Sequence, residues 1–171
     1  MKNIIRTSVL LLAVALFGIQ SVEAQKKSKL KFVDAKTLTI INKIDNDCEP
    51  FSRINPEKYA ARKSLGKTST GLAIVFRTDS RSIDARWTTL HNKTYSNSTP
   101  ILQSGLDLYI RENGEWIFAG VGRPTFNSNN HKYTIVKRMA EGTKECLLYL
   151  PMHNGVTSLE LGVEKGAMIE P

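Results

Sequence analysis

The residue types that most often carry catalysis are present in this chain, but they do not stand in catalytic patterns. His91, His131 and His153 are far apart and lack the His-x-His or His-x-x-x-His spacing that gathers metal ligands. No Gly-x-Ser-x-Gly turn presents a serine nucleophile, and the segment 78–80 (TDS) lies between two apolar segments, as turns do. We therefore predict no catalytic residue, no metal site and no cofactor in this chain.

Two residues of opposite charge stand on the polar side of alternating segments. Arg86 lies in 82–87 (SIDARW) and Asp107 in 105–111 (GLDLYIR). If these segments are neighbouring strands, a bidentate Arg–carboxylate pair would bridge them. Such a pair is either structural, because buried charges are normally paired, or the floor of a sugar-binding patch with Tyr109. We expect the structural role, with Arg86 and Asp107 in contact and Asp107→Asn lowering stability.

Cys48 and Cys146 are the two cysteines of the chain. In an oxidising compartment they can form one disulfide, or they can remain two isolated buried thiols. Pairing cannot be deduced from the sequence, and both alternatives stay open at this point.

The elements that position these residues are predicted to be short strands. Segments 82–87, 105–111 and 157–163 (TSLELGV) alternate apolar and polar residues, and Asn113-Gly114 is a strong hairpin signal. No window shows a convincing helical period. Roughly seven such strands between Gly, Pro and Asn turns indicate an all-β, antiparallel, jelly-roll-like sandwich forming a single domain. We place this sandwich at residues 65–171, with residues 25–64 leading into it.

The first 24 residues are predicted to be a cleaved signal peptide. Lys2 and Arg6 precede the apolar run 8–19, and small residues follow up to Ala24. The run is shorter than the roughly 20 residues that span a bilayer, so we expect cleavage after Ala24 and no membrane span in the mature chain. The protein is then exported, to the periplasm or the extracellular space.

The net charge is +8, which raises the question of an anionic partner. Part of this excess lies in the lysine-rich stretch 26–31, which is typical of a solvated N-terminal arm. No basic helix with interleaved aromatic residues and no nucleic-acid-binding motif is present. We therefore expect no nucleic-acid partner.

Several segments together resemble a known family. The segment 104–109 (SGLDLY), Trp116, the segment 120–124 (GVGRP) and the closing segments 148–151 and 154–163 resemble the GxDLY-type domain at the N-terminus of SGNH-hydrolase-type, GDSL-like esterases. The resemblance covers most of the mature chain and implies a β-sandwich. It also implies an esterase domain acting on acylated carbohydrates, expected after Pro171. The Gly-Asp-Ser block that carries the nucleophile of that domain is absent here.

Two functions follow from these observations. In the first, the chain is a non-catalytic accessory domain that packs against the esterase domain. In the second, it is a stand-alone carbohydrate-binding module that holds a glycan with exposed aromatic residues such as Tyr95, Tyr109 or Trp116. A complete enzyme is the third reading, and the missing motifs disfavour it.

Overall fold

The computed structural model describes residues 30–59, 61 and 63–171, and the predicted signal peptide lies outside this part. The described chain forms ten β-strands and three short helical segments, η1 (Ala35–Thr37), α2 (Lys63–Gly66) and α3 (Pro100–Ser104). None of the helices in this part has the length and apolar character needed to cross a membrane.

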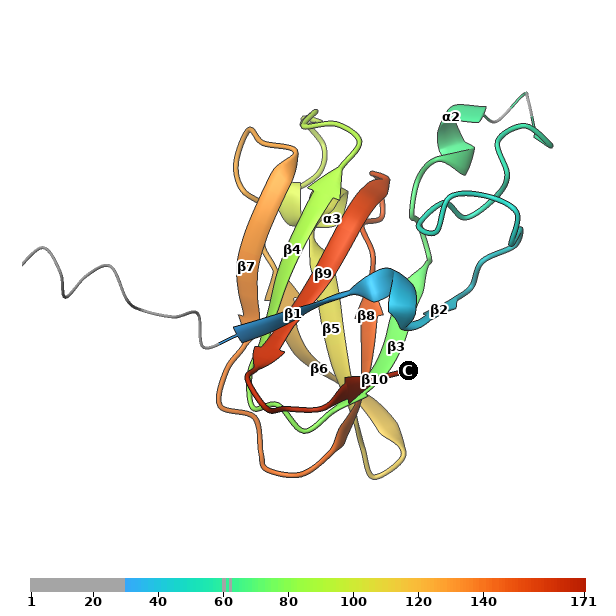
Figure 1. The fold of residues 1–171 in the computed structure, drawn as a ribbon. Helices are drawn as coiled ribbons and strands as arrows, with labels where there is room; N and C mark the ends of the chain where they lie inside the picture. Colours follow the sequence, from blue (N-terminus) through green and yellow to red (C-terminus); the bar gives the residue numbers. More distant parts are fainter. Residues whose placement is uncertain (1–29, 60, 62) are drawn as a thin grey trace, which may run out of the picture.

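The strands form two antiparallel sheets packed face to face (Figure 1). The four-stranded sheet A has the order β1 (Leu30–Asp34), β9 (Val156–Glu164), β4 (Ile83–Thr89) and β7 (Asn130–Val136). The six-stranded sheet B has the order β10 (Ile169–Glu170), β3 (Ala73–Thr78), β8 (Lys144–Tyr149), β5 (Leu106–Glu112) and β6 (Glu115–Gly122), and β2 (Thr39–Ile41) also pairs with β3. The predicted all-β sandwich is confirmed.

The core lies between the two sheets and is filled by alternate residues of each strand. Trp87 of β4 and Leu106 and Leu108 of β5 are each at most 2% exposed. The indole N–H of Trp87 donates to the carbonyl of Ser104 at 2.9 Å, so this polar atom is satisfied inside the core. Because inward residues of both sheets meet here, the outward residues of sheet A and sheet B lie on opposite outer faces.

The turn between β5 and β6 is the predicted Asn-Gly hairpin. Asn113 (φ 51°) and Gly114 (φ 87°) both adopt left-handed conformations, as a tight hairpin turn with the right twist requires. The chain turns differently at two other places. The segment 79–82 carries the chain from β3 of sheet B to β4 of sheet A, and the segment 150–155 carries it from β8 to β9. These turns therefore join the two sheets instead of closing hairpins.

The segment predicted to lead into the domain belongs partly to the sandwich itself. β1 pairs with β9 in sheet A, and β2 pairs with β3 in sheet B. The sandwich therefore includes strands from Leu30 onward, earlier than the boundary at residue 65 that the sequence suggested. Between β2 and β3, residues 42–72 form a connecting arm that projects beside one end of the sandwich (Figure 1).

Candidate functional site

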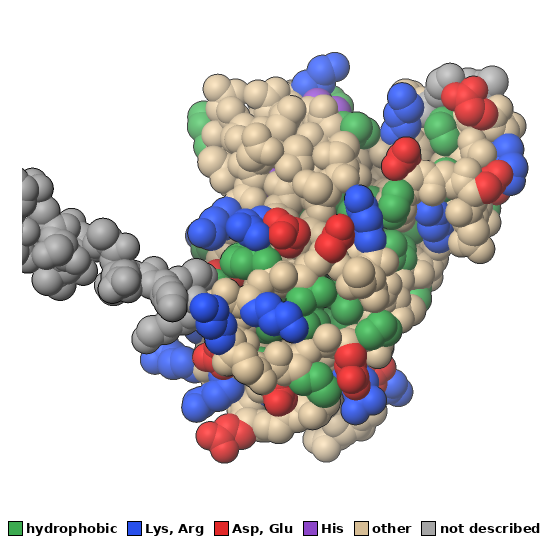
Figure 2. All heavy atoms as spheres, in the orientation of Figure 1, with side chains coloured by type: hydrophobic (Ala, Val, Ile, Leu, Met, Phe, Trp, Pro, Cys, Tyr) green, Lys and Arg blue, Asp and Glu red, His purple; other side chains and the backbone are tan. Residues whose placement is uncertain are grey.

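Arg86 has a different partner from the one predicted. It points outward from β4 in sheet A, where its Nη2 lies 2.9 Å from Oε1 of Glu160 on the neighbouring strand β9. Its guanidinium also stacks 3.6 Å above the centroid of the Phe32 ring. Figure 2 shows basic and acidic side chains interspersed on this side of the molecule. Arg86 is thus held by an ion pair and a cation–π contact within sheet A.

The predicted contact between Arg86 and Asp107 is wrong. Asp107 lies on β5 of sheet B, and it points outward on the opposite side of the sandwich from Arg86. Alternation along each segment correctly identified which side chains face outward. It carries no information on whether two segments share a sheet, and here they do not.

Asp107 and Tyr109 instead belong to an exposed aromatic face of sheet B. Tyr109 contacts Phe118 edge-on at 5.6 Å between ring centroids and Tyr149 edge-on at 5.9 Å. The strand register explains the cluster, because Tyr109 lies opposite Phe118 and Asp107 lies opposite Tyr149. Trp116, Phe118 and Tyr149 are 38%, 56% and 37% exposed. We call Asp107, Tyr109, Trp116, Phe118 and Tyr149 the aromatic face.

The carboxylate of Asp107 has no cationic partner on this face. No ion pair joins it to any residue that the structure describes. Partial burial among the surrounding side chains raises its pKa above the usual aspartate value. An unpaired carboxylate beside exposed rings is a hydrogen-bond acceptor available to a partner.

In the Gly-x-Asp-Leu-Tyr sequence, Gly105 and Leu108 are buried, whereas Asp107 and Tyr109 point outward. A side chain at Gly105 would lie 2.5 Å from the carbonyl oxygen of Ile101, so only glycine fits there. Leu108 is fully buried in the core. Asp107 and Tyr109 point outward and fill no core position, so folding alone does not account for Asp107.

A second candidate site is a cleft at the end of the sandwich where the connecting arm projects. Its volume is about 950 Å³, within the range of small-molecule sites. Figure 2 shows it as the hollow between the sandwich body and the arm. Three segments line it: residues 64–70 of the arm, the loop after β4 with α3, and the loop from Met152 to Gly155. Of the predicted aromatic residues, Tyr95 lies here and not on the aromatic face.

Buried polar side chains hold the loops of this cleft in place. Asn154 is fully buried, and its Nδ2 donates to the carbonyl of His91 at 2.7 Å and to Oγ of Ser104 at 3.0 Å. The Nε2 of Gln103, a residue only 1% exposed, donates to the carbonyl of Ser98 at 2.9 Å. These bonds order the loop 91–98 before any ligand arrives. This role has no signature in the sequence, because it depends on the burial of the Asn154 side chain.

The three histidines occupy different environments. His131 is buried: the backbone N–H of Thr125 donates to its Nδ1 at 3.0 Å, and its Nε2 lies 3.1 Å from Oγ1 of Thr89. Burial lowers the pKa of this imidazole, and both ring nitrogens are engaged. His91 and His153 line the cleft instead. Among the described residues, no group of three potential metal ligands comes together.

The two cysteines are free thiols, so the disulfide left open by the sequence is not formed. Cys146 is buried in the core opposite Phe76, and burial raises its pKa to about 12. Cys48 lies in the connecting arm, where its Sγ donates to the carbonyls of Asp45 and Ser52. The sequence could not separate these two positions, because spacing along a chain does not report distance in space.

Comparison with known proteins matched one family. The model described as GxDLY, the N-terminus of SGNH-hydrolase-type esterases, matches residues 30–169. No curated protein matches the chain.

Two solved structures are similar to this one. A putative GDSL-like lipase from Bacteroides ovatus ATCC 8483 is 39% identical with a TM-score of 0.78, over 82% of this chain and 42% of that chain. The salicylyl-acyltransferase SsfX3 of a tetracycline biosynthetic pathway is 19% identical with a TM-score of 0.59, over 85% of this chain and 42% of that chain. The second likeness shows the fold alone. This chain spans less than half of the length of either protein.

Proposed function

This chain belongs to the GxDLY family, the N-terminal domain of SGNH-hydrolase-type esterases, and we propose that it is the non-catalytic accessory domain of a secreted carbohydrate esterase. In this proposal a signal peptide exports the protein to the periplasm or beyond, and the catalytic domain follows Pro171. The accessory domain packs against that catalytic domain and helps to shape its substrate cleft.

The outward position of Asp107 and Tyr109 is the observation that carries this proposal. Exposed aromatic rings with a few polar groups are the composition of protein–protein interfaces, where Tyr and Trp contribute much of the binding energy. Asp107 forms no ion pair with any residue that the structure describes, so its carboxylate can accept a hydrogen bond or pair with a cation of a partner. We assign the aromatic face to the catalytic domain.

The path of the chain agrees with this assignment. β10, the last strand, pairs with β3 in sheet B, the sheet that carries the aromatic face. A domain that follows Pro171 would therefore start at the edge of this sheet. The GDSL-like lipase from Bacteroides ovatus has more than half of its length outside the matched region, enough for a second domain.

The test begins with the coding sequence after residue 171, where an open frame encoding a Gly-Asp-Ser block is expected. Amide hydrogen exchange is then compared between the long protein and the chain 25–171. Strands β5 and β6 should exchange more slowly in the long protein, and Phe118→Ser should remove that protection. Phe126→Ser is the matched control, because Phe126 is 82% exposed and lies off the aromatic face. Equal exchange of β5 and β6 in both proteins would refute the docking.

Inactivity of the short chain is the second part of the test. The purified chain 25–171 should show no turnover of p-nitrophenyl acetate above a buffer blank. Turnover that survives purification and disappears when a single serine is replaced would contradict the accessory role.

A stand-alone carbohydrate-binding module is the second candidate, and the exposed rings of the aromatic face favour it. A frame that closes after Pro171, together with glycan binding that Trp116→Ala or Tyr109→Ala abolishes, would replace our assignment with this one.

A further inference from the structure

The cleft beside the connecting arm is a site that the accessory role does not use. We propose that it binds a sugar that carries a carboxylate. This inference concerns a different end of the molecule from the aromatic face, and it stands whether or not a catalytic domain docks there.

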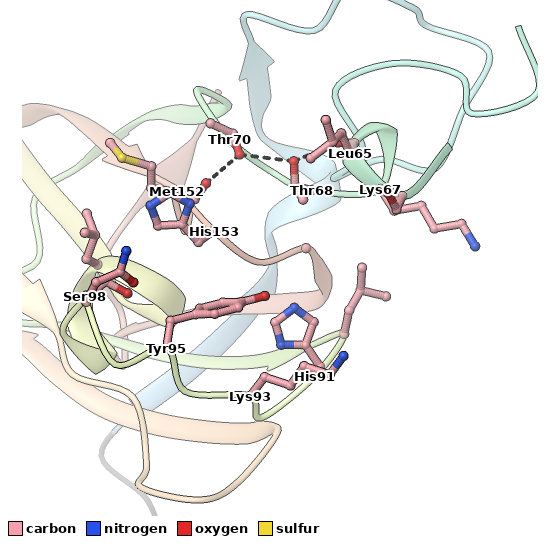
Figure 3. Close-up of a pocket in the computed structure, with 15 residues that line it drawn as sticks. Leu65, Lys67, Thr68, Thr70, His91, Lys93, Tyr95, Ser98, Met152 and His153 are labelled. Carbon is pink, nitrogen blue, oxygen red and sulfur yellow. Dashed lines mark hydrogen bonds between the residues drawn. The ribbon is translucent and has the colours of Figure 1, made fainter. Parts of the chain in front are cut away.

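The charges of the cleft select an anion. Its lining includes Lys93, His91 and His153 but no aspartate or glutamate. Lys67 also belongs to the lining, but its side chain extends away from the other three (Figure 3). Lys93 and Lys67 form no ion pair with any residue that the structure describes. Partial burial, with the nearby positive charge of Lys93 as the smaller cause, lowers the pKa of His91. A carboxylate would pair with the Lys93 ammonium and accept hydrogen bonds from the histidine side chains.

The uncharged part of the lining selects a ligand with both hydroxyl groups and an apolar face. Tyr95 lines the cleft, is 46% exposed and makes a T-shaped contact with His91, with 6.5 Å between ring centroids. Leu90 and Met152 are 44% and 53% exposed beside it. The hydroxyl and amide groups of the lining surround these apolar surfaces: Ser64, Thr68, Thr70, Asn97 and Ser98. A sugar ring presents C–H groups on its face and hydroxyl groups on its rim, and a carboxylate supplies the charge.

The cleft is also ordered in advance, which lowers the entropic cost of binding. Oγ1 of Thr70 donates to the carbonyl of Met152 at 2.6 Å, which ties the arm to the opposite loop. The arm and that loop pack backbone against backbone, because a side chain at Gly155 would lie 2.2 Å from the carbonyl oxygen of Lys67. Figure 3 shows Tyr95, His91 and His153 arranged around the same space, with Lys93 beside His91 and Lys67 extending away from them.

Titration of the chain 25–171 tests this proposal by nuclear magnetic resonance with three probes: D-glucuronate, its neutral methyl ester, and acetate. Glucuronate should shift the resonances of His91, His153 and Tyr95. The methyl ester should bind about fivefold more weakly, the effect of one partly exposed ion pair. Acetate should bind weakest, because it lacks the ring.

Matched variants separate specific recognition from general attraction. Lys93→Gln should remove the preference for glucuronate over its ester, whereas Lys67→Gln should keep it because that side chain points elsewhere. Tyr95→Ala should weaken the binding of both glucuronate and its methyl ester. Tyr59→Ala is its control, since Tyr59 is 44% exposed and lies outside the cleft lining. Thermal unfolding verifies that each variant is folded.

Two results would overturn the proposal. The first is equal binding of glucuronate and its methyl ester, or binding of neither. The second is that Lys67→Gln and Lys93→Gln reduce the preference for glucuronate over its ester equally, which would indicate attraction to the overall positive charge of the protein. Neither result bears on the hydrogen-exchange test of the aromatic face, so the two proposals can fail separately.

Discussion

Arg86 and Asp107 look alike in the sequence, since each is a single charge on the polar side of an amphipathic strand. Their surroundings are nevertheless opposite. Arg86 has Glu160 and the Phe32 ring, whereas Asp107 has exposed aromatic residues and a raised pKa. The first charge is explained by the fold of this chain, and the second is not.

Asp107→Asn should therefore not destabilise the isolated chain, contrary to the expectation from the sequence. A raised carboxyl pKa means that the folded state holds the proton more tightly than the unfolded state. The stability from this group is present at low pH and is lost as pH rises through the folded pKa. At pH 7 the substitution removes an unfavourable charge, and we expect the free energy of unfolding to rise or to stay within about 0.5 kcal/mol.

Urea unfolding at pH 7 measures this effect, with Glu160→Gln for comparison. That variant removes the partner of Arg86 and should cost up to about 1 kcal/mol, because both side chains are partly exposed. A loss from Asp107→Asn larger than that from Glu160→Gln would show that Asp107 has a structural partner after all.

His131 should make the fold sensitive to mild acid. Because its Nδ1 accepts the Thr125 N–H, a second proton on the ring would break that hydrogen bond. The lowered pKa means that the neutral form stabilises the fold above the ordinary histidine pKa of about 6.5, and that this stability is lost as pH falls through the folded pKa. The free energy of unfolding should thus decrease from pH 7 to pH 5.

Chemical unfolding across this pH range provides the check. His131→Asn should be less stable at pH 8 but should depend less on pH. His153→Gln, at an exposed position, should keep the pH dependence of the unsubstituted chain. If the free energy of unfolding of His131→Asn decreases between pH 7 and pH 5 as steeply as that of the unsubstituted chain, groups other than His131 cause the pH dependence.

The loop from β8 to β9 holds the cleft together through Gly155. Gly155→Ala would place a methyl group 2.2 Å from the carbonyl oxygen of Lys67 and 2.4 Å from Cδ1 of Leu90. Since backbone must move to admit it, we expect a loss of about 1–3 kcal/mol and altered resonances in both loops. Gly142→Ala is the control: its surroundings are open but its φ is +91°, so it should cost about 1 kcal/mol and leave the cleft unchanged.

The strands were largely predictable, and their assignment to sheets was not. Alternation located the strands around Arg86, Asp107 and Leu159, because one face of each is buried. Alternation reads one strand at a time, so the Arg86–Asp107 pairing could not be tested before the sheets were known. The cleft was not predicted either: Tyr95, His91 and His153 come from loops whose positions depend on the buried contacts of Asn154 and Gln103.

The sandwich as a whole depends on residues before position 65. Removing residues 30–64 would delete β1 and β2. It would also remove two buried side chains, Phe51 (1% exposed) and Leu38 (7% exposed), and would leave the core residues that pack against them exposed to solvent. Each such side chain contributes about 1.5–3 kcal/mol when buried, a large share of the 5–15 kcal/mol that typically separates folded from unfolded domains.

We therefore expect the chain 30–171 to unfold in one cooperative transition and the chain 65–171 to fail to fold. Circular dichroism and calorimetry on the two chains distinguish these outcomes. A cooperative transition for 65–171 with unchanged enthalpy would show that β1 and β2 are dispensable.

The arrangement of β2 and β10 along β3 has a consequence for solubility. β3 carries the apolar sequence Ala73-Ile74-Val75-Phe76, and an open edge of such a strand would recruit strands from other molecules. β2 covers Ala73–Val75 and β10 covers Arg77–Thr78 on that side, so the two ends of the domain together occupy the edge. β2 and β10 together thus protect this edge against intermolecular strand addition, and the loss of both would leave it open as a template for aggregation.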